Sequence, residues 1–382
     1  MIQIQRRNNM NQTVQRKNSK QIEGDLRTRL KNREWQVGEK IASCRELAEQ
    51  YQCSVNTIGK ALRNLEMSGF VVREPRRGVI VSGDVETHQK TGLIAAFVPQ
   101  IDNPLWTSAL RGIEDYMHQY NYSMISGSHD LSSARLRQTL DNLQSIPIDG
   151  MILSPLNQTA EERQWFRHLI ESKLEQNIKI VLLDRFLYEL NVPYVTSDNI
   201  NASYKLTRVL LENGHRSIAF VSGNTHISTI EERYAGFSQA CYDAGLKEGN
   251  FFRFGMDLQQ EDFRNQFDAF EQQLMAYLKA HPVTALFAAN DQFAKASWIA
   301  LKNAGLRIPE DISLVSYDVD NLRKEVPIRI AGVRQNFYEM GTMAANILLN
   351  HIFISRPQED MQLGTIVPAD ILKGDSVRNI NS

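Results

Sequence analysis

Polar side chains recur directly after short apolar runs in the last three quarters of this 382-residue chain. They are carboxylates, amides, hydroxyls and an arginine, at Asp102-Asn103, Ser128-His129-Asp130, Ser154, Asp184-Arg185, Asp198, Ser222, Asn290-Asp291 and Asp318. Carboxylates and amides form paired hydrogen bonds, and a guanidinium binds two neighbouring oxygens. The set therefore suits a ligand with several hydroxyl groups. Trp106, Phe186 and Tyr317 could cover the apolar face of its ring.

Several of these side chains also have a purely structural interpretation. A polar side chain just after a strand often caps the helix that follows it. This alternative applies to Asp184, Asp198, Asn199, Asn201 and Asp291. At these five positions the sequence leaves the choice between a helix cap and a ligand contact open.

Catalysis has little support in the sequence. His129 and Asp130 could form an acid–base pair, but no nucleophile motif or second ordered base accompanies them. The chain also lacks a Gly-x-Gly-x-x-Gly fingerprint, a phosphate-binding GK[ST] loop and a Gly-x-Ser-x-Gly elbow. Its three cysteines, Cys44, Cys53 and Cys241, are too scattered for a zinc site or a disulfide framework. The sequence predicts no enzyme activity, no metal and no cofactor.

A second group of residues with chemical potential lies on an expected helix between Ser54 and Gly69. An apolar stripe repeats there at helical spacing and consists of Ile58, Ala61, Leu62 and Leu65. The opposite face carries Asn56, Lys60 and Arg63. Ser54 is expected to cap the start of the helix, and Gly69 to follow its end. Amide and ammonium groups on such a helix suit base edges and phosphates in the major groove of DNA.

The preceding residues predict the partner of this helix. Ser43 and Glu46 have the spacing of a capping box and open a short helix from Arg45 to Tyr51. The three residues Gln52 to Ser54 then form the turn. Two helices joined by so short a turn are typical of a helix-turn-helix.

The following residues predict a β-hairpin. Val71 to Glu74 and Val79 to Ser82 are short β-rich runs, and Pro75 to Gly78 joins them through a basic tip. A hairpin with guanidinium groups at its tip can contact the DNA backbone or enter the minor groove. Helix-turn-helix and hairpin together predict a winged helix.

The motifs between Gly38 and Gly69 resemble the GntR family of DNA-binding domains, and the likeness covers about residues 20 to 82. In that family the arginine matching Arg45 holds phosphate, the start of the recognition helix reads bases, and the wing glycine approaches the minor groove. We therefore expect DNA contacts from Ser43, Arg45, Ser54, Val55, Asn56, Thr57, Lys60, Arg76, Arg77 and Gly78.

The recognition helix departs from the family at two positions. Val55 and Gly59 stand where the family usually has arginine, which disfavours guanine-rich sites. We expect Asn56 to contact adenine instead, and Val55 a thymine methyl group. Gly59 is unfavourable by about 1 kcal/mol relative to alanine inside a helix. Either a close approach to DNA or evolutionary drift would explain it.

The hydrophobic pattern changes at Gly92. Short apolar runs alternate from there with amphipathic segments, and these runs are GLIAAFV, SMIS, GMILS, KIVLLD, YVTS, SIAFVS, ALFAA, SLVSY and IAGV. Such runs predict parallel strands covered by helices on both faces. Nine or more of these steps suit two doubly wound lobes, which bind ligands at the carboxyl ends of their strands. The expected fold class is α/β, with an N-terminal winged helix-turn-helix and a two-lobed ligand-binding domain.

The segments IDGMILSP, LLDRF, ERYAGF, FAANDQFA and PEDISLVSYD resemble the LacI/GalR effector domain, which is related to periplasmic sugar-binding proteins. The likeness covers about residues 92 to 376 and implies seven of the ligand contacts, to which the strand-end analysis adds Ser128 and Asp130. The predicted contacts are Asn103, Trp106, Ser128, Asp130, Arg185, Arg233, Asn290, Asp318 and Gln335. Trp106 also shares helical spacing with Leu110 and Ile113, which leaves a core position as its alternative.

Charge divides the chain at the same place as the motifs. Residues 1–84 hold 16 Lys and Arg against 9 Asp and Glu, and residues 85–382 hold 27 against 35. A basic module on an acidic body suits a polyanion at one end only. The expected domains are a disordered leader (1–19), the winged helix (20–83), a linker (84–91) and the ligand-binding domain (92–376).

The sequence contains no candidate membrane segment. No apolar run approaches the roughly 18 residues that cross a bilayer. The first twenty residues lack the apolar core of a secretory signal. We therefore expect a cytoplasmic protein without membrane contacts.

The two resemblances in one chain are similar to the architecture of arabinose-responsive repressors. They imply a homodimeric transcription regulator, expected to be a repressor, whose affinity for operator DNA is controlled by a monosaccharide bound between two lobes. A purine or other non-sugar effector is the alternative, and an aromatic sandwich in the pocket would favour it. A sugar-binding protein without DNA function is a further alternative, which the basic N-terminal module disfavours.

Overall fold

The structure of the protein is a computed structural model. It describes residues 18–32, 34–67, 70–74, 77–81, 90–156, 159–176, 178–223, 227–256, 263–322, 325–353 and 363–381. Contacts divide the chain into two compact units. The N-terminal unit consists of Met1–Lys90 and Leu349–Pro357, and the C-terminal unit of Thr91–Leu348 and Gln358–Ser382.

Among the described residues before Lys90, three helices surround one small core. The helices are α1 (Ser19–Lys31), α2 (Cys44–Gln50) and α3 (Val55–Met67). The apolar stripe predicted for α3 is fully buried, and it packs against Ile22, Leu26 and Leu30 of α1. Asn18 caps α1 with its side chain, so this helix begins at the end of the predicted leader. Residues 1–17 and the predicted linker residues 84–89 lie outside the described residues.

The predicted hairpin is present. Strands β1 (Val71–Glu74) and β2 (Gly78–Val81) pair antiparallel, with Val71 opposite Val81 and Glu74 opposite Gly78. Strand β2 therefore begins at Gly78, one residue earlier than predicted. Strand β2 also bonds to the segment before α2, since Gly38 N–H donates to the Val81 carbonyl and Ile41 N–H donates to the Val79 carbonyl. These bonds fix the base of the wing against the helices.

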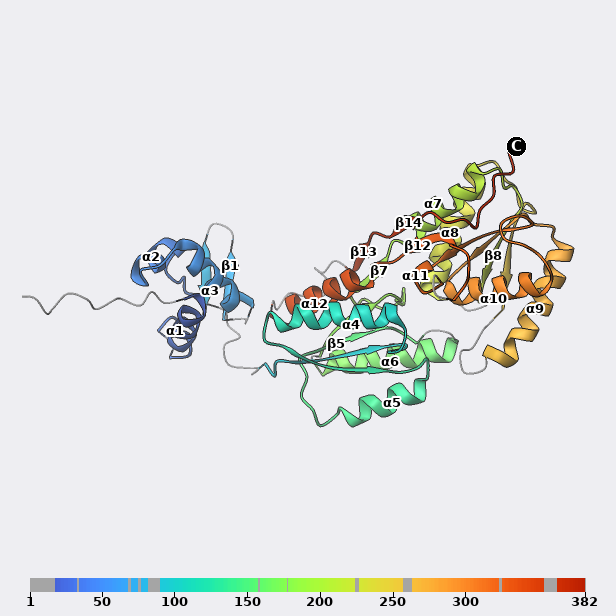
Figure 1. Cartoon of the computed structure of the whole chain (residues 1–382). Helices are drawn as coiled ribbons and strands as arrows, with labels where there is room; N and C mark the ends of the chain where they lie inside the picture. Colours follow the sequence, from blue (N-terminus) through green and yellow to red (C-terminus); the bar gives the residue numbers. More distant parts are fainter. Residues whose placement is uncertain are drawn as a thin grey trace, which may run out of the picture. The chain divides into compact units, whose positions relative to one another are not determined.

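The described residues of the C-terminal unit form two six-stranded sheets. Figure 1 labels several of their strands and the helices around them. The first sheet has the strand order β13-β7-β6-β5-β3-β4 and the second β14-β12-β11-β10-β8-β9. All neighbours are parallel except β14, which runs antiparallel to β12. The central strands are buried along their whole length, in agreement with the continuous apolar runs. The two predicted doubly wound lobes are confirmed.

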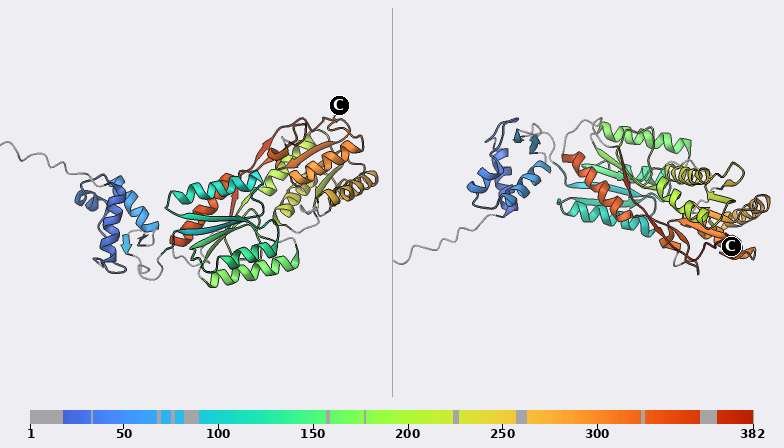
Figure 2. Two further views of the ribbon diagram at one scale, coloured as in Figure 1. Left: turned by 60° about the horizontal axis from the view of Figure 1, so that its bottom comes forward. Right: turned by 90° about the horizontal axis from the view of Figure 1, so that it is seen from above.

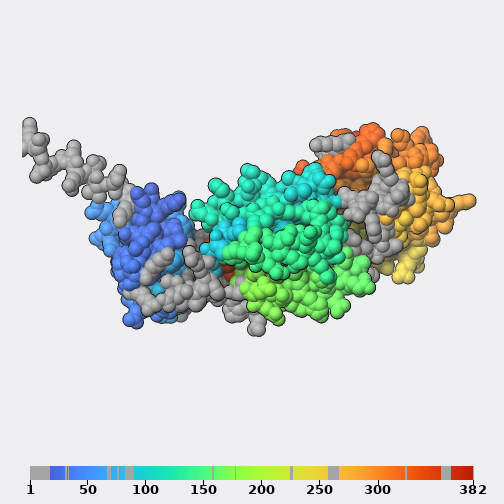
Figure 3. Space-filling model, turned by 90° about the horizontal axis from the view of Figure 1, so that it is seen from below, coloured from blue at the N-terminus to red at the C-terminus, as the bar shows by residue number. Residues whose placement is uncertain are grey.

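The first lobe is built on the first sheet. Its strands are β3 (Leu93–Val98), β4 (Ser123–Ser128), β5 (Gly150–Leu153), β6 (Lys179–Leu183), β7 (Tyr194–Ser197) and β13 (Gly364–Val367). Its helices are α4 (Pro104–His118), α5 (Ser133–Asn142), α6 (Ala160–Glu175) and α12 (Phe337–Phe353). Helices α4 and α12 lie side by side in both views of Figure 2. A Cβ added at Gly341 of α12 would lie 2.1 Å from the Ala109 carbonyl of α4. Figure 3 shows this lobe from below, with the part of it from β3 to α6 coloured from teal to green.

The second lobe is built on the second sheet. Its strands are β8 (Ile218–Ser222), β9 (Phe251–Gly255), β10 (Ala285–Ala288), β11 (Ser313–Tyr317), β12 (Ala331–Arg334) and β14 (Asp370–Leu372). Its helices are α7 (Asn199–Glu212), α8 (Ser228–Asp243), α9 (Phe263–Ala280), α10 (Asp291–Asn303) and α11 (Val319–Leu322). Three connections cross between the lobes, from β7 to α7, from β12 to α12 and from β13 to β14.

The C-terminal unit begins with a tightly bonded segment. The Asp149 carboxylate accepts hydrogen bonds from the backbone N–H of Thr91 at 3.0 Å and of Gly92 at 3.1 Å. It also accepts one from the Tyr122 hydroxyl at 2.8 Å. Asp149 immediately precedes β5, and Gly92 immediately precedes β3. The chain is thus held at the amino ends of two neighbouring strands.

Two kinds of feature are absent from the described residues. None of the described helices has both the length and the apolar character that a bilayer span needs. No group of three or more His, Cys, Asp or Glu side chains in the described part of the chain is placed to hold a metal ion.

Candidate functional site

Side-chain caps fix both helices of the helix-turn-helix. The Ser43 hydroxyl accepts from the Glu46 N–H, and the Glu46 carboxylate accepts from the Ser43 N–H at 2.7 Å, so the predicted capping box is present. The Ser54 hydroxyl accepts from the Thr57 N–H at 3.1 Å and lies 2.7 Å from the Thr57 hydroxyl. Three predicted DNA contacts, Ser43, Ser54 and Thr57, therefore also hold the starts of these helices in place.

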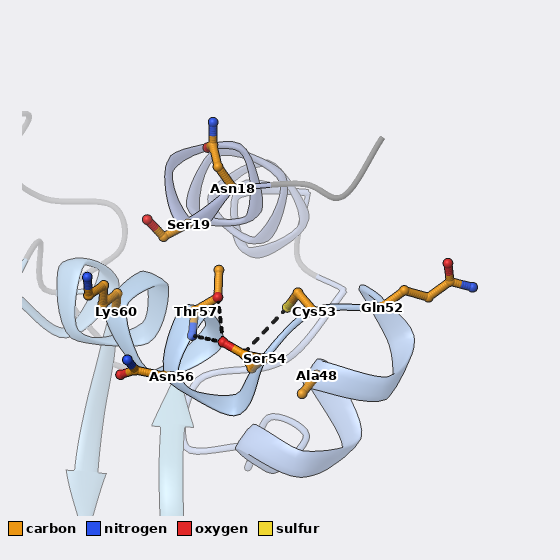
Figure 4. Close-up of a pocket in the computed structure, with 9 residues that line it drawn as sticks. All are labelled: Asn18, Ser19, Ala48, Gln52, Cys53, Ser54, Asn56, Thr57 and Lys60. Atoms are coloured by element: carbon orange, nitrogen blue, oxygen red, sulfur yellow. Dashed lines mark hydrogen bonds between the residues drawn. The ribbon is translucent and has the colours of Figure 1, made fainter. Parts of the chain in front are cut away.

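A groove of about 840 Å³ runs along the start of α3 (Figure 4). Its lining comes from α1, α2, the turn and α3, and consists of Asn18, Ser19, Ala48, Gln52, Cys53, Ser54, Asn56, Thr57 and Lys60. Asn56 and Lys60 are exposed, and no hydrogen bond or ion pair with other described residues engages them. Val55, beside them, is 50% exposed. This surface offers the amide, ammonium and methyl groups that major-groove reading requires.

In the wing, one of the predicted DNA contacts already has a partner within the chain. Arg77 donates to the Glu74 carboxylate at 2.7 Å, so its guanidinium already has an acidic partner at the base of the tip. Gly78 has φ +98°, a conformation that L side chains rarely adopt. The positive φ alone thus explains why glycine occupies this position. The approach of Gly78 to the minor groove stays a prediction. Arg76 lies outside the described residues.

Replacing Arg45 by alanine is expected to weaken binding to all DNA sequences alike. Arg45 is the second residue of α2, is exposed, and has no ion pair among the described residues. One lost phosphate contact should lower the slope of log affinity against log salt by about 0.9. Fluorescence anisotropy over a salt series would measure the slope, with the exposed Arg208→Ala of α7 as control. An unchanged slope would remove Arg45 from the interface.

Replacing Gly59 by alanine should raise the free energy of unfolding of the N-terminal unit by about 1 kcal/mol. The nearest atom to a Cβ at this position is Arg63 Nη1 at 3.8 Å, an ordinary contact, so the helix has room for a methyl group. Chemical denaturation would measure the gain. Unchanged DNA affinity would support drift as the origin of Gly59, whereas weaker affinity in the stabilised variant would show that the glycine approaches DNA closely.

In the second lobe, Arg233 of α8 is the centre of a buried polar network. Its Nε donates to Asn199 Oδ1 at 2.9 Å and its Nη1 to the Ala289 carbonyl at 2.8 Å. Nη1 also lies 3.6 Å from Asp318 Oδ2, and the guanidinium carbon lies 3.7 Å from the centre of the Tyr317 ring. Only 4% of Arg233 is exposed. The network fixes the arginine at the carboxyl ends of β10 and β11.

Asp318 links this network to the end of β12, from which the chain crosses to the first lobe. It follows β11 with φ +62°, and Gln335, just after β12, donates to its Oδ1 at 2.6 Å. Burial raises the pKa of Asp318, and the nearby Arg233 guanidinium opposes that rise. The neighbouring Asp291 has a pKa raised to about 6, first by burial and then by the charge of Asp318. Arg233, Asp318 and Gln335, three predicted ligand contacts, therefore lie together.

Arg185 occupies the corresponding edge of the first lobe. Asp184 follows β6 with φ +67°, and its Oδ2 lies 3.8 Å from Arg185 Nε. Burial raises the pKa of Asp184 to about 6, while the charges of Arg185 and Arg233 lower it. Among the described residues, Arg185 Nε and Nη1 and Asp184 Oδ1 are buried without a hydrogen-bond partner. Buried polar groups are normally paired, so these atoms can satisfy a polar ligand.

The other predicted ligand contacts have local partners. Asn103 and Asn290 cap α4 and α10 through their side-chain oxygens, which leaves their amide nitrogens. Trp106 is buried and packs edge-on against Phe337 at 5.0 Å between ring centres, which fits its core alternative. The Ser128 hydroxyl donates to Asp130, whose carboxylate also pairs with Arg135. Ligand contact stays a prediction for all of them.

Sequence reasoning missed one residue of the network. The sequence left Asn199 open between a cap of α7 and a ligand contact, and Asp198, which had the same two interpretations, caps the helix by accepting from the Asn201 N–H at 3.2 Å. The Asn199 side chain instead accepts from Arg233 and donates to Glu232 at 2.9 Å. The sequence carries no signal for this, since the partners lie more than thirty residues away.

Two family models match the chain. Residues 90–363 match the family described as periplasmic binding proteins and sugar binding domain of LacI family. Residues 18–81 match bacterial regulatory proteins of the gntR family. A ribose operon repressor from Halalkalibacterium halodurans is 26% identical over 82% of this chain and 91% of its own length. Catabolite control protein A from Priestia megaterium is 25% identical over 78% of this chain and 84% of its own length.

Solved structures share the fold of the C-terminal unit. A LacI family regulator from Enterococcus faecium with bound ribose superposes with a TM-score of 0.60 at 24% identity, over 76% of this chain and all of that one. CcpA of Lactococcus lactis gives 0.62 at 20% identity, over 75% of this chain and 99% of that one.

The curated relatives are transcription regulators rather than enzymes, and both predicted resemblances are confirmed. The winged helix and the polar strand ends agree with a protein that binds DNA with one unit and a small molecule with the other. The chain belongs to the LacI family of periplasmic-binding-protein-like regulators, carries a GntR-type DNA-binding domain, and is a ligand-controlled, DNA-binding transcription regulator.

Proposed function

We propose that this regulator is a homodimeric repressor whose operator affinity is controlled by a neutral monosaccharide. The observation that carries the proposal is the set of polar side chains at the carboxyl ends of the strands, in which Asp184, Arg233, Asp318 and Gln335 are buried and Arg185 is partly buried. Two arginines are balanced there by carboxylates. Such paired groups suit the adjacent hydroxyls of a sugar better than an anionic ligand.

A purine effector has less support. Relatives include repressors named PurR, such as that of Actinobacillus pleuropneumoniae, which is 25% identical over 78% of this chain. A planar base calls for an aromatic sandwich, but the aromatic residues near the cluster have other partners. Phe186 stacks on Tyr194 at 4.0 Å, and Arg233 covers Tyr317. Ribose is the first sugar to test, because relatives are named for it.

A thermal-shift screen of the full chain would test the effector. The panel holds D-ribose, L-arabinose, D-xylose, D-galactose and L-fucose, with adenine, guanine and hypoxanthine as the alternative class. We expect one neutral sugar to raise the melting temperature and Arg185→Met to abolish the shift. A shift with a purine alone would contradict the proposal.

Calorimetry with and without operator DNA would then test the control of binding. If the sugar weakens operator binding, operator must weaken sugar binding by the same factor. Equal sugar affinities in both titrations would contradict the allosteric part of the proposal. Sedimentation equilibrium would test whether the protein is a dimer. A symmetric dimer requires an operator with two related half-sites.

A further inference from the structure

We propose that His129 reads a hydroxyl group of the effector together with Arg185, so that the site accepts neutral polyols and rejects their phosphate and carboxylate derivatives. This inference rests on the proposed function and adds a specificity residue to it. His129 belongs to the polar strand ends noted in the sequence, but it is not among the nine predicted ligand contacts.

His129 lies at the carboxyl edge of the first sheet, at the point where the order of its strands reverses. It follows β4 and its N–H donates to Val98 at the end of β3, while the Ser154 N–H, after β5, donates to Phe97. Strands β4 and β5 flank β3 on opposite sides. His129 Nε2 nevertheless lies 3.2 Å from the Ser154 carbonyl, so the imidazole spans the carboxyl end of β3. Ligands of doubly wound sheets bind at such reversal points.

The contact with Ser154 decides which ring nitrogen carries the proton. A backbone carbonyl only accepts hydrogen bonds, so Nε2 must donate. Burial, followed by the charge of Arg185, lowers the pKa of His129 to about 4, so the ring is neutral near neutral pH. Nδ1 therefore presents a lone pair. His129 is 1% exposed, and Nδ1 has no hydrogen-bond partner among the described residues.

The other buried atoms without partners at this edge are mostly donors. Arg185 offers Nε and Nη1, and the Ser154 hydroxyl also lacks a partner among the residues that the structure describes. Arg185 lies close enough for its charge to act on the His129 ring. Among the described residues, the first lobe thus places two unpaired acceptors, His129 Nδ1 and Asp184 Oδ1, at the same edge as several unpaired donors.

A hydroxyl group satisfies both needs at once. It donates its proton to His129 Nδ1 and accepts from the Arg185 guanidinium. A carboxylate or a phosphate dianion has no proton to donate and would place oxygen lone pairs against that of Nδ1. Asp184 adds a negative charge beside Arg185, which further disfavours an anion. The geometry therefore selects an uncharged hydroxyl at this position.

The test is a comparison of His129→Leu with His129→Gln. Leucine removes the acceptor, whereas the glutamine amide can still donate to Ser154 and accept from a hydroxyl. His215→Gln serves as the matched control, because His215 is equally buried but both of its ring nitrogens have partners, Thr284 and Arg378. Melting curves without sugar would confirm that each variant folds.

Calorimetry would use D-ribose, L-arabinose and D-xylose, each with its monodeoxy analogues and its 5-phosphate. For the wild type we expect that removing one particular hydroxyl group from the sugar lowers the affinity about 10- to 100-fold relative to the parent sugar. The His129→Leu variant should bind the parent sugar more weakly than the wild type does, by that same factor. It should bind the deoxy analogue as tightly as it binds the parent sugar. His129→Gln and His215→Gln should keep the wild-type pattern.

Two results would overturn the inference while leaving the proposed function intact. One is a His129→Leu protein that discriminates each deoxy analogue as the wild type does, which would make His129 a structural residue. The other is a wild type that binds a sugar phosphate more tightly than the neutral parent. Failure of every neutral sugar in the panel to bind would instead overturn the proposed function itself.

Discussion

Replacing Arg233 by methionine is expected to abolish effector binding and to lower the free energy of unfolding of the C-terminal unit by about 3–5 kcal/mol. The side chain is 4% exposed and holds Asn199, the Ala289 carbonyl and Asp318 at once. Methionine fills much of the same volume but leaves the Asp318 carboxylate buried without a countercharge. Urea denaturation and sugar titration would measure the two losses.

The loss of stability in Arg233→Met should depend on pH in a defined direction. Burial already raises the pKa of Asp318 in the folded protein, and Arg233 works against this. Without the guanidinium the folded-state pKa rises further above the unfolded value. A carboxyl group with a raised folded pKa is favourable only while protonated, so the deficit grows as the pH rises through that pKa. Denaturation at about pH 5 and about pH 8 should show the larger deficit at the higher pH.

The double variant Arg233→Met, Asp318→Asn is the control for this argument. It removes the uncompensated charge but keeps an oxygen that can accept from Gln335. We expect it to recover a large part of the lost stability and to flatten the pH dependence, without restoring sugar binding. If the double variant were as unstable as Arg233→Met, the charge of Asp318 would not be the cause.

Replacing Gly236 by alanine should lower the free energy of unfolding by about 3 kcal/mol, the upper end for overpacking. Gly236 lies in α8 where that helix crosses the start of α7. A Cβ there would lie 2.0 Å from the Ile200 carbonyl oxygen and 2.9 Å from its carbon, and both are backbone atoms. The two helices would have to separate, and Arg233 lies one turn away on the same helix. Sugar affinity should fall as well.

The sign of the Gly236 result distinguishes packing from helix propensity. Propensity alone predicts that alanine stabilises a helix interior by about 1 kcal/mol relative to glycine. Ala235→Ser, at the exposed neighbouring position, is the matched control and should change stability little. A higher melting temperature for Gly236→Ala would contradict the close helix contact.

The sequence predicted the central strands well and the edges poorly. The runs singled out from the sequence correspond to central strands and to β4. They do not include β9, β13 or β14, which are the other three sheet edges. An edge strand has one neighbour and faces solvent, so it needs no continuous apolar run. Ile366 of β13, for example, is 63% exposed. The pattern that marks a buried parallel strand is absent there.

The helix cap and the buried face of the winged helix could be predicted because each depends on residues that lie close together in the sequence. A capping box spans four residues, and the buried stripe of α3 repeats every three or four. The ligand-binding unit depends on contacts over long separations. Trp106 meets Phe337 and Asn199 meets Arg233, and neither pair could be found from spacing. Likewise, the unpaired Nδ1 of His129 results from the orientation of a ring, which composition does not encode.

The attachment of the chain at Asp149 has a mechanical consequence. Thr91 and Gly92 are held at the amino ends of β3 and β5, whereas His129 and Arg185 lie at the opposite, carboxyl ends. The six residues of β3 separate the two by about 20 Å. A strand in the middle of a sheet neither stretches nor slides by itself, so it acts as a stiff lever. With the effector bound at the carboxyl edge as proposed, a small tilt of the strand there would swing the anchored segment as one piece, and the signal would travel as rotation of a rigid body rather than through a chain of side chains.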